Sequence, residues 1–269
     1  WQIENGVAGI IVGGSTGEFY ALSKEERIQQ FEFAAERINS RVEFMAGVND
    51  IRVDECLQIS SAAVDAGAKS LLVAAPPYSL PSEEELANHV LEIANKTGLP
   101  IMLYNYPGRT GVEMGENFLD IVANNPLIAA IKESSGDYSR LPLLSNNYSS
   151  IELAVGGEEQ VLEFAAWGAK SWVCATANFF PSECVQLMDI LGKQSDFEKG
   201  RRLMAAFMPL MKALEQGGKF LQCVKLGCEQ QGRPSGKVRL PLLPIEDSLR
   251  KEMIGVIDKT RSSLHSILN

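Results

Sequence analysis

Seven short apolar runs recur along the chain, and segments with helical character separate them. Each run has the length of a β-strand and is rich in Val, Ile, Leu or Ala. Runs with little polar alternation are typical of strands that are buried on both faces, as in parallel sheets. The runs cover residues 9–12, 42–46, 70–74, 100–104, 128–132, 151–155 and 171–175. The pattern predicts repeated βα units on a parallel sheet.

Two of the intervening segments begin with the sequence signature of a helix start. Ser23 followed by Glu26, and Ser82 followed by Glu85, each form a predicted capping box ahead of apolar residues at helical spacing. The second of these helices is expected to stop at Gly98, because a proline follows shortly after it. Both helix starts fit the predicted alternation of strand and helix.

The number of strands bears on the architecture. Residues 1–6 resemble the end of a helix with Gly6 as its C-terminal residue, and they lead directly into the first strand. We therefore expect that one preceding βα unit is absent from this sequence, and seven strands plus one complete a (β/α)8 TIM barrel. An open doubly wound α/β sheet is the competing architecture. The barrel is favoured because polar residues follow most of the strands instead of gathering at one crevice.

The chain continues beyond what a barrel requires. Residues 181–191 supply the last barrel helix, and three further helices are predicted at about 196–215, 219–230 and 245–268. The expected domains are therefore residues 1–192, a (β/α)8 barrel lacking its first β-strand, and residues 193–269, a C-terminal three-helix extension.

Composition excludes several classes of function. The 269 residues are 45% hydrophobic and carry a formal net charge of -9, with no cluster of Lys and Arg, which argues against nucleic acid as a partner. No apolar run approaches the roughly 20 residues of a membrane helix, and no signal peptide is recognised. The five cysteines form no CxxC pair and indicate reduced thiols, not a disulfide framework or a metal site. A cytoplasmic location is expected.

Lys132 stands in an unusual place, at the end of the apolar run 128–132. A lysine that is withdrawn from water is less stable as an ammonium and becomes available as a neutral nucleophile for a carbonyl group. The alternative is a lysine whose ammonium extends from the strand end into solvent. The residues at the other strand ends decide between these interpretations, because barrel enzymes build their active sites there.

Two strand ends carry hydroxyl groups on constrained backbone. After the first strand, the glycine-rich turn 13–18 contains Gly14, Ser15 and Thr16, and its backbone N–H groups are suited to bind a carboxylate or a phosphate. After the third strand, Tyr78 follows two prolines. Taken singly, both features also suit an ordinary turn and an exposed loop tyrosine.

The fourth strand ends with Tyr104, and Arg109 follows a few residues later between glycines. Arginine is suited to bidentate recognition of a carboxylate, although a solvated loop arginine is the alternative. Together these strand ends contain an amine, phenols and carboxylate-binding groups. They contain no cysteine nucleophile, no histidine cluster and no dinucleotide motif. The set fits Schiff-base chemistry on a 2-oxo acid, with tyrosine transferring protons and no cofactor.

Three ordered motifs resemble the dihydrodipicolinate synthase/N-acetylneuraminate lyase family of class I, Schiff-base-forming pyruvate aldolases. The motifs are 14–18 (GSTGE), 104–111 (YNYPGRTG) and 131–133 (IKE), and the resemblance extends along the whole chain through 156–158 (GGE) and 175–178 (ATAN).

The resemblance implies a role for each candidate residue. Lys132 would form the Schiff base with pyruvate and Tyr104 would transfer protons above it. Ser15 would relay protons between Tyr104 and Tyr78, and Tyr78 would reach in from a neighbouring subunit.

The remaining roles concern substrate binding. Ser15 and Thr16, on the turn that contains Gly14, would bind the pyruvate carboxylate. Arg109 would hold the carboxylate of aspartate semialdehyde, and the backbone carbonyl near Val173 would face pyruvate. The family also implies a homotetramer built as a dimer of dimers and a step in lysine biosynthesis.

The chain departs from the synthase pattern in three respects. The first strand of the family is not present, and the loop at 156–158 reads GGE where synthases usually carry GDD. Lys24 and Arg27 stand where lysine-inhibited synthases have histidine, so feedback inhibition by lysine is not expected.

The expected reaction is condensation of pyruvate with aspartate semialdehyde, and Arg109 is the reason for placing it first. The alternative is an aldolase or dehydratase of 2-keto-3-deoxy sugar acids, or an enzyme like N-acetylneuraminate lyase. A non-catalytic binding protein is disfavoured, because the amine, the phenol and both hydroxyl groups are retained.

Overall fold

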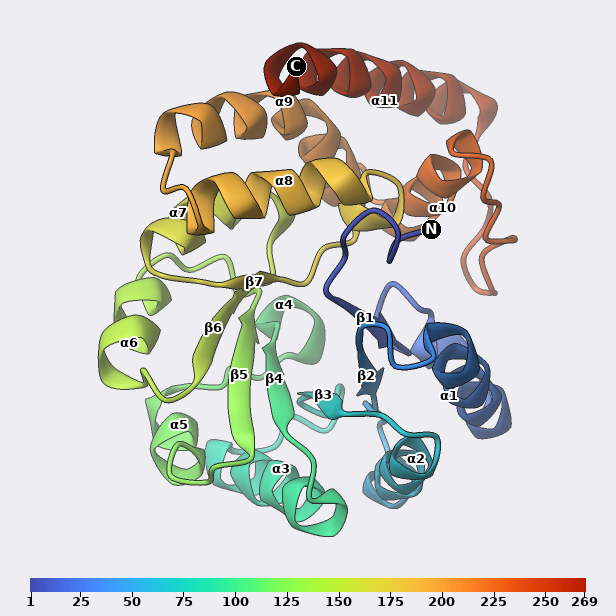
Figure 1. Cartoon of the computed structure of the whole chain (residues 1–269). Helices are drawn as coiled ribbons and strands as arrows, with labels where there is room; N and C mark the ends of the chain where they lie inside the picture. The colour runs from blue at the N-terminus through green and yellow to red at the C-terminus, as the bar shows by residue number, and fades with distance from the viewer. The chain divides into compact units, whose positions relative to one another are not determined.

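The structure is a computed structural model that describes residues 1–269, and it divides into two compact units (Figure 1). Residues 8–154 form the first, which we call the strand unit. Residues 1–7 and 155–269 form the second, which we call the helical unit. The two units are described in turn.

Parallel strands at the centre of the strand unit follow one another in chain order. They are β1 (Gly9–Val12), β2 (Glu43–Gly47), β3 (Ser70–Ala74), β4 (Ile101–Asn105), β5 (Ile128–Glu133) and β6 (Glu152–Val155). Neighbours from β1 to β5 pair in parallel, with one irregularity of register between β4 and β5 at Ile101/Met102. Parallel pairing brings all the carboxyl ends of these strands to the same edge. The predicted α/β class with a parallel sheet is thereby confirmed.

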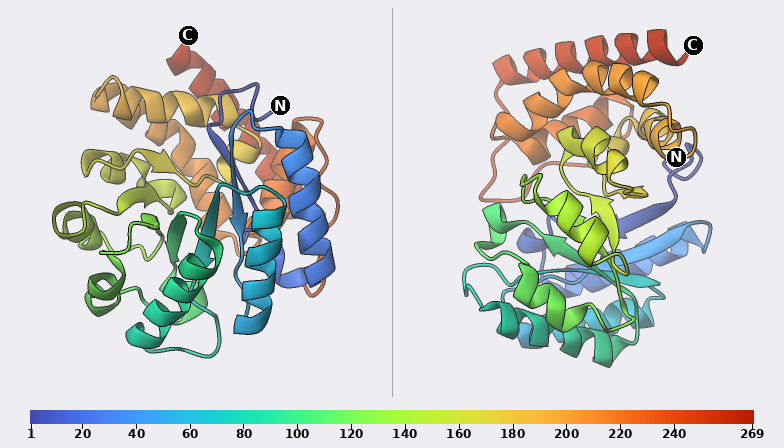
Figure 2. Two further views of the ribbon diagram at one scale, coloured as in Figure 1. Left: turned by 60° about the horizontal axis from the view of Figure 1, so that its bottom comes forward. Right: turned by 90° about the vertical axis from the view of Figure 1, so that its left-hand side faces the viewer.

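Helices connect the strands of this unit. They are η1 (Phe19–Ala21), α1 (Lys24–Ile38), α2 (Val53–Asp65), α3 (Glu83–Thr97), α4 (Pro107–Thr110), α5 (Glu116–Val122) and α6 (Arg140–Asn147). The longer ones pack side by side in chain order, α1 against α2, α2 against α3 and α3 against α5 (Figures 1 and 2). Their inward residues form the core with the strands, and Phe31, Ile59, Leu71, Ile93 and Phe118 are all fully buried.

Both predicted capping boxes are present. The Ser23 hydroxyl accepts from the Glu26 N–H, and the Glu26 carboxylate accepts from the Ser23 N–H. Ser82 and Glu85 repeat the arrangement at the start of α3. Gly98 ends α3 with φ +64°, a left-handed conformation that glycine adopts without a steric penalty.

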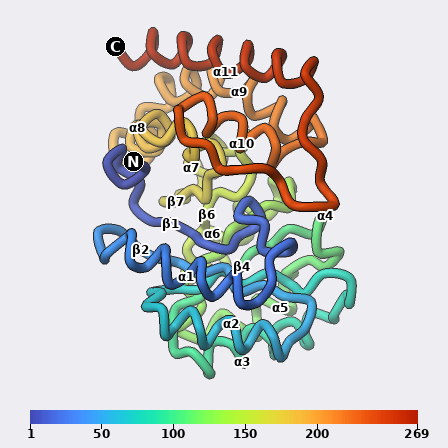
Figure 3. Tube along the Cα trace, turned by 90° about the vertical axis from the view of Figure 1, so that its right-hand side faces the viewer, coloured from blue at the N-terminus to red at the C-terminus, as the bar shows by residue number.

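The helical unit consists mainly of long helices. It contains η2 (Glu158–Gln160), α7 (Val161–Ala166), β7 (Ser171–Trp172), η3 (Thr176–Asn178), α8 (Pro181–Gly192), α9 (Phe197–Gln216), α10 (Phe220–Gln230) and α11 (Asp247–Leu268). Helix α11 packs along α9, and α10 also contacts both (Figure 3). The last three helices begin and end within two residues of the predicted positions. No helix has both the length and the apolar character that a membrane span requires.

Residues 1–6 form hydrogen-bonded turns with the features of a helix end: the Asn5 N–H donates to the Trp1 carbonyl, the Val7 N–H donates to the Gln2 carbonyl, and Gly6 has φ +90°. One segment of the helical unit differs from expectation. Strand β7 spans two residues where five were predicted. The Val173 N–H still donates to Val155 of β6, but the N–H groups of Ala175 and Thr176 donate to the Glu158 carboxylate. A side chain therefore replaces the strand pairing at this end of β7.

Candidate active site

Lys132 and Tyr104 face each other on paired strands of the strand unit. They are register partners at the carboxyl ends of β5 and β4. The Lys132 Nζ atom lies 3.9 Å from the centroid of the Tyr104 ring, within cation–π distance. Tyr104 is buried and Lys132 is half-buried. The structure thus brings together the two residues for which the sequence predicted the central chemistry, an amine and a phenol.

The segment after β4 adds a second tyrosine and the predicted arginine. The rings of Tyr104 and Tyr106 lie 6.0 Å apart, and the Arg109 guanidinium lies 5.4 Å from the Tyr106 ring centroid. Pro107 begins the short helix α4, and Gly111 ends it with φ +74°. This turn holds Arg109 close to Tyr106, while its side chain stays exposed and able to meet a ligand.

Three tyrosines near Arg109 influence its pKa. Desolvation lowers its pKa, but a hydrogen bond with Tyr106 and charge interactions with Tyr106, Tyr104 and Tyr20 outweigh this effect, so the pKa is raised. Burial, followed by the charge of Glu18, raises the pKa of Tyr20, while Arg109 opposes that rise. Arg109 therefore stays positively charged, as a carboxylate-binding group requires.

The glycine-rich turn after β1 forms as predicted from its composition. Gly13 has φ +75°, the Gly17 N–H donates to the Gly14 carbonyl at 3.0 Å and the Glu18 N–H donates to the Ser15 carbonyl at 3.2 Å. Ser15 and Thr16 are half-buried in this turn. Since β1 is parallel to β4 and β5, the turn follows the same edge of the sheet, and the binding role of Ser15 and Thr16 stays a prediction.

Tyr78 occupies a strained turn after β3. Its φ is +73°, and the Ser79 N–H donates to the Pro77 carbonyl at 2.9 Å across it. This is the pattern of a γ-turn with a positive central φ, which is rare and costly for a residue other than glycine. The Tyr78 side chain is 92% exposed. An aromatic ring held outward on strained backbone is consistent with the predicted role in a neighbouring subunit, which stays a prediction.

Val173 and the GGE loop belong to the helical unit. Val173 follows β7, and the predicted contact of its carbonyl with pyruvate stays a prediction. Glu158 of the loop is buried and binds the N–H groups of Ala175 and Thr176 and the Thr176 hydroxyl. The departure from the synthase pattern at this loop therefore has a structural role, because Glu158 organises the chain after β7.

Lys24 and Arg27, at the positions considered for lysine regulation, have ordinary partners. The Lys24 Nζ donates to the Gln58 side chain on the surface. Arg27 is almost fully buried, paired with Asp50 at 3.1 Å and bonded to the Gly47 carbonyl at 3.0 Å. Arg27 thus connects α1 to the end of β2 and is occupied by that structural role.

The cysteines offer no competing nucleophile. All five are free thiols. Burial raises the pKa of Cys56 to about 12 and that of Cys223 to about 11, and it raises the pKa of Cys174, Cys184 and Cys228 as well. A thiol in this state is protonated at neutral pH and reacts poorly.

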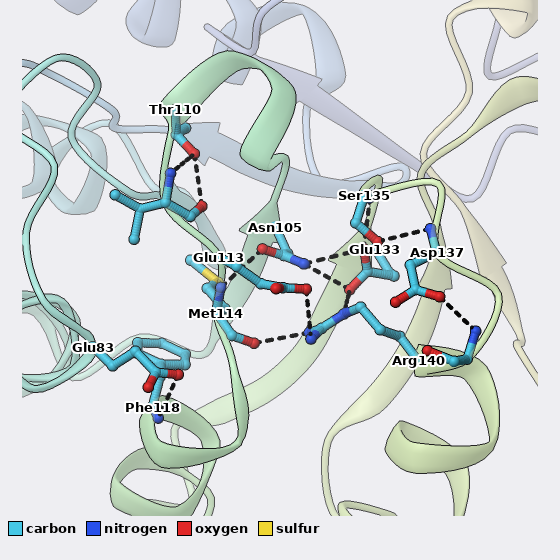
Figure 4. A network of polar contacts seen from close by, with 12 residues as sticks. Glu83, Asn105, Thr110, Glu113, Met114, Phe118, Glu133, Ser135, Asp137 and Arg140 are labelled. Atoms are coloured by element: carbon cyan, nitrogen blue, oxygen red, sulfur yellow. Dashed lines mark hydrogen bonds and ion pairs between the residues drawn. The ribbon is translucent and has the colours of Figure 1, made fainter.

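The residues that support the site from behind were not among those predicted from the sequence. Glu133, directly after Lys132, is buried and accepts hydrogen bonds from Asn105 and Arg140 (Figure 4). The available signal was the carboxylate itself, because a glutamate inside an apolar strand needs a buried partner. The identity of that partner required the fold.

Comparison with known proteins places the chain within a family. Residues 1–260 match the model of the dihydrodipicolinate synthetase family. The 4-hydroxy-tetrahydrodipicolinate synthase of Methanocaldococcus jannaschii is 34% identical over 260 residues, which cover 95% of this chain and 88% of that protein.

Solved structures give the same result. The 4-hydroxy-tetrahydrodipicolinate synthase of the thermoacidophilic methanotroph Methylacidiphilum fumariolicum SolV superposes with a TM-score of 0.93 at 29% identity, covering 99% of this chain and 89% of that one. The chloride-inhibited dihydrodipicolinate synthase of Acinetobacter baumannii, solved with pyruvate, has a TM-score of 0.90 at 28% identity, covering 97% and 89%.

Proposed function

Because the chain belongs to the dihydrodipicolinate synthetase family, we propose that it is a class I, Schiff-base-forming lyase that acts as a 4-hydroxy-tetrahydrodipicolinate synthase. Its substrates are pyruvate and aspartate semialdehyde. The observation that carries the proposal is the position of the Lys132 amine, 3.9 Å from the ring centroid of its register partner Tyr104. The pyruvate bound to the A. baumannii enzyme supports the choice of 2-oxo acid.

The first half of the reaction concerns pyruvate. The neutral Lys132 amine adds to the C2 carbonyl, and loss of one water gives a protonated imine. The imine withdraws electrons from the methyl carbon C3, so that a proton leaves C3 and an enamine forms. Tyr104, beside the amine, supplies and removes protons in these steps. Ser15 and Thr16 bind the pyruvate carboxylate through hydroxyl and backbone N–H groups.

The second half requires an aldehyde. The enamine carbon forms a bond to the aldehyde carbon of aspartate semialdehyde, and the aldehyde oxygen takes up a proton. The amino group of the second substrate then adds to the C2 imine carbon, and the C–N bond to Lys132 breaks, which releases the product and restores the lysine amine. Arg109 holds the carboxylate of this second substrate, which fits its exposed, charged guanidinium. The backbone carbonyl near Val173 faces pyruvate, and Ser15 relays protons between Tyr104 and Tyr78.

We also propose the assembly and the finer fold of the family. Residues 1–192 form a (β/α)8 barrel that lacks its first β-strand, with residues 193–269 as a helical extension, which the TM-scores of 0.93 and 0.90 support. It acts in the cytoplasm as a homotetramer, a dimer of dimers, in which Tyr78 serves the site of a neighbouring subunit. The 92% exposure of Tyr78 and its strained turn support this assignment.

Reductive trapping tests the proposed mechanism. Pyruvate and borohydride should add one stable pyruvyl mass, located at Lys132 by peptide mass spectrometry, and Lys132→Ala should not be labelled. Labelling that survives this substitution would refute the assignment of the amine.

A substrate panel tests the second half. Aspartate semialdehyde, N-acetylneuraminate and 2-keto-3-deoxygluconate are assayed for consumption or release of pyruvate. Turnover with aspartate semialdehyde supports the synthase, whereas release of pyruvate from a sugar acid alone would replace it with an aldolase.

A further inference from the structure

A second pair of residues stands directly behind Lys132 and Tyr104. Glu133 and Asn105 are the next residues on β5 and β4, and they too are register partners. Since side chains alternate across a strand, they point to the opposite face of the sheet from the reactive pair. The Asn105 Nδ2 atom donates to both Glu133 carboxylate oxygens, at 3.1 and 2.9 Å. Both residues are only 1% exposed.

Arg140, at the start of α6, binds this pair with its whole guanidinium group (Figure 4). Its Nε donates to Glu133 at 2.6 Å, its Nη1 to the Glu113 carboxylate at 3.1 Å and its Nη2 to the Met114 carbonyl at 2.8 Å. The Arg140 side chain is 5% exposed. Three acceptors in fixed directions allow one position of this planar group.

The loops after both strands are tied to the same residues. The Met114 N–H donates to the Asn105 Oδ1 at 3.0 Å, which returns the loop after β4 to its own strand. The Ser135 N–H donates to Glu133 at 2.7 Å, and the Ser134 N–H donates to the Asn105 carbonyl at 2.9 Å. We call Asn105, Glu133 and Arg140 the bracing triad, since they join the two strand ends and both following loops.

We propose that Glu133 and Arg140 are positioning residues for the Schiff-base reaction, and this inference rests on the proposed function. They fix β4 against β5 at the residues next to Tyr104 and Lys132, and so they set the position of the phenol relative to the amine. Neither touches the substrate. The arrangement is sensitive to substitution, because removing either charge takes away the shortest ion pair of the other, at 2.6 Å in the buried interior.

The kinetic signature follows from this indirect action. A displacement of about 1 Å between reacting groups can lower a rate about 100-fold. The hydrogen bonds of the triad reach the loop after β4 at Glu113 and Met114, beyond Arg109, so we expect binding of the substrate carboxylates to change less than the position of the amine. We expect its loss to reduce imine formation and kcat, with little change in the KM for aspartate semialdehyde.

The test uses Glu133→Gln and Arg140→Lys in the full chain. Glu133→Gln keeps the size of the side chain but presents an amide group where Arg140 and Asn105 donate. Arg140→Lys keeps the charge but not the three directed hydrogen bonds. For both variants we expect pyruvate trapping at Lys132 to slow by about 10- to 100-fold, the range given by misplacement of the reacting groups.

A control variant separates a loss of stability from a loss of positioning. Ile93→Ala removes a fully buried side chain from α3 in the same unit, away from the triad. It should lower the melting temperature but leave trapping within twofold of the parent when assayed well below the transition. If Glu133→Gln and Arg140→Lys behave like Ile93→Ala, the triad is structural only and the inference is wrong.

A second readout is independent of the substrate. Fluorodinitrobenzene labels lysine amines, and peptide mass spectrometry follows Lys132 against pH in the parent and the variants. A changed pH profile of Lys132 in both triad variants, but not in Ile93→Ala, supports positioning, whereas unchanged profiles overturn it. If the parent is not trapped by pyruvate, the proposed function fails and the inference fails with it, whereas a trapped parent with unchanged Lys132 profiles in the variants overturns the inference alone.

Discussion

The Lys132 amine lies against the face of the Tyr104 ring, with 3.9 Å between Nζ and the ring centroid. The face of a phenol attracts a cation, while its hydroxyl group at the ring edge exchanges protons. One residue therefore offers two separable contributions, orientation of the amine and proton transfer.

Tyr104→Phe separates these contributions, because it keeps the ring and removes the hydroxyl. We expect kcat to fall by about 10²- to 10⁴-fold, the usual effect of losing a general acid–base group. Tyr106→Phe is the matched control, since Tyr106 packs beside Tyr104 and has no assigned proton transfer. Because Tyr106 also hydrogen-bonds Arg109, kcat is measured with both pyruvate and aspartate semialdehyde at saturation, and equal effects on kcat would remove the special role of Tyr104.

Arg109→Ala should weaken use of aspartate semialdehyde far more than imine formation with pyruvate. Loss of a charged hydrogen-bonding partner corresponds to about 1.5–3 kcal/mol in kcat/KM for the second substrate. Arg109→Lys restores the charge but not the bidentate geometry and should recover only part of the loss. Trapping with pyruvate serves as the control, and a parallel loss of trapping would place Arg109 at the first substrate.

Tyr78 is expected to act in the site of a neighbouring subunit, and hybrid oligomers test this directly. Tyr78→Phe and Lys132→Ala are each expected to be nearly inactive alone. In a dimer with one subunit of each variant, one of the two sites combines an intact Lys132 with an intact Tyr78 from the other subunit. Co-expression in equal amounts should restore about a quarter of the parent activity, since half of the random pairs are hybrid and half of their sites are complete. No recovery would mean that Tyr78 serves its own chain.

His89 on α3 makes stability depend on pH. Burial lowers its pKa from the usual value near 6.5, and its Nδ1 has no hydrogen-bond partner. The unfolded chain therefore binds a proton more readily than the folded one, so stability is retained above about pH 6.5 and lost as the pH falls below it.

The slope from one such proton is at most about 1.4 kcal/mol per pH unit. Urea unfolding of the parent and of His89→Gln at pH 7.5 and pH 5.5 should show that the variant loses less stability on acidification. His265→Gln replaces the exposed histidine of α11 and should behave like the parent. If both variants lose the same amount, His89 does not carry this dependence.

Much of the fold followed from local patterns. Apolar runs located the strands to within a residue or two, apart from β7, and the Ser23 and Ser82 capping boxes formed as predicted. These features depend on neighbours in the chain, which periodicity and capping report. The extent of β7 was not predictable in this way, because the Glu158 carboxylate, which lies 17 and 18 positions before its backbone donors, ends the strand.

The candidate site was predictable in part for a similar reason. Lys132 and Tyr104 each end a recognisable strand, and parallel pairing brings such ends together. The bracing triad was not predicted, because Arg140 is seven residues from Glu133 and 35 from Asn105 and only the folded loops bring them into contact. Its residues look like ordinary polar groups of a strand end and a helix start.

The alternation of Lys132 and Glu133 on β5 has a consequence for how this protein can change over time. Deleting or inserting one residue in the strand would exchange their faces, placing a carboxylate at the reaction centre and an ammonium beside the buried Arg140 guanidinium. Such a change would abolish chemistry and folding in one step. Length variation is therefore excluded from β4 and β5 but open to the exposed part of the segment between them that carries Arg109. Adaptation to another aldehyde substrate can therefore proceed by changes in that loop, while strands β4 and β5 keep their length.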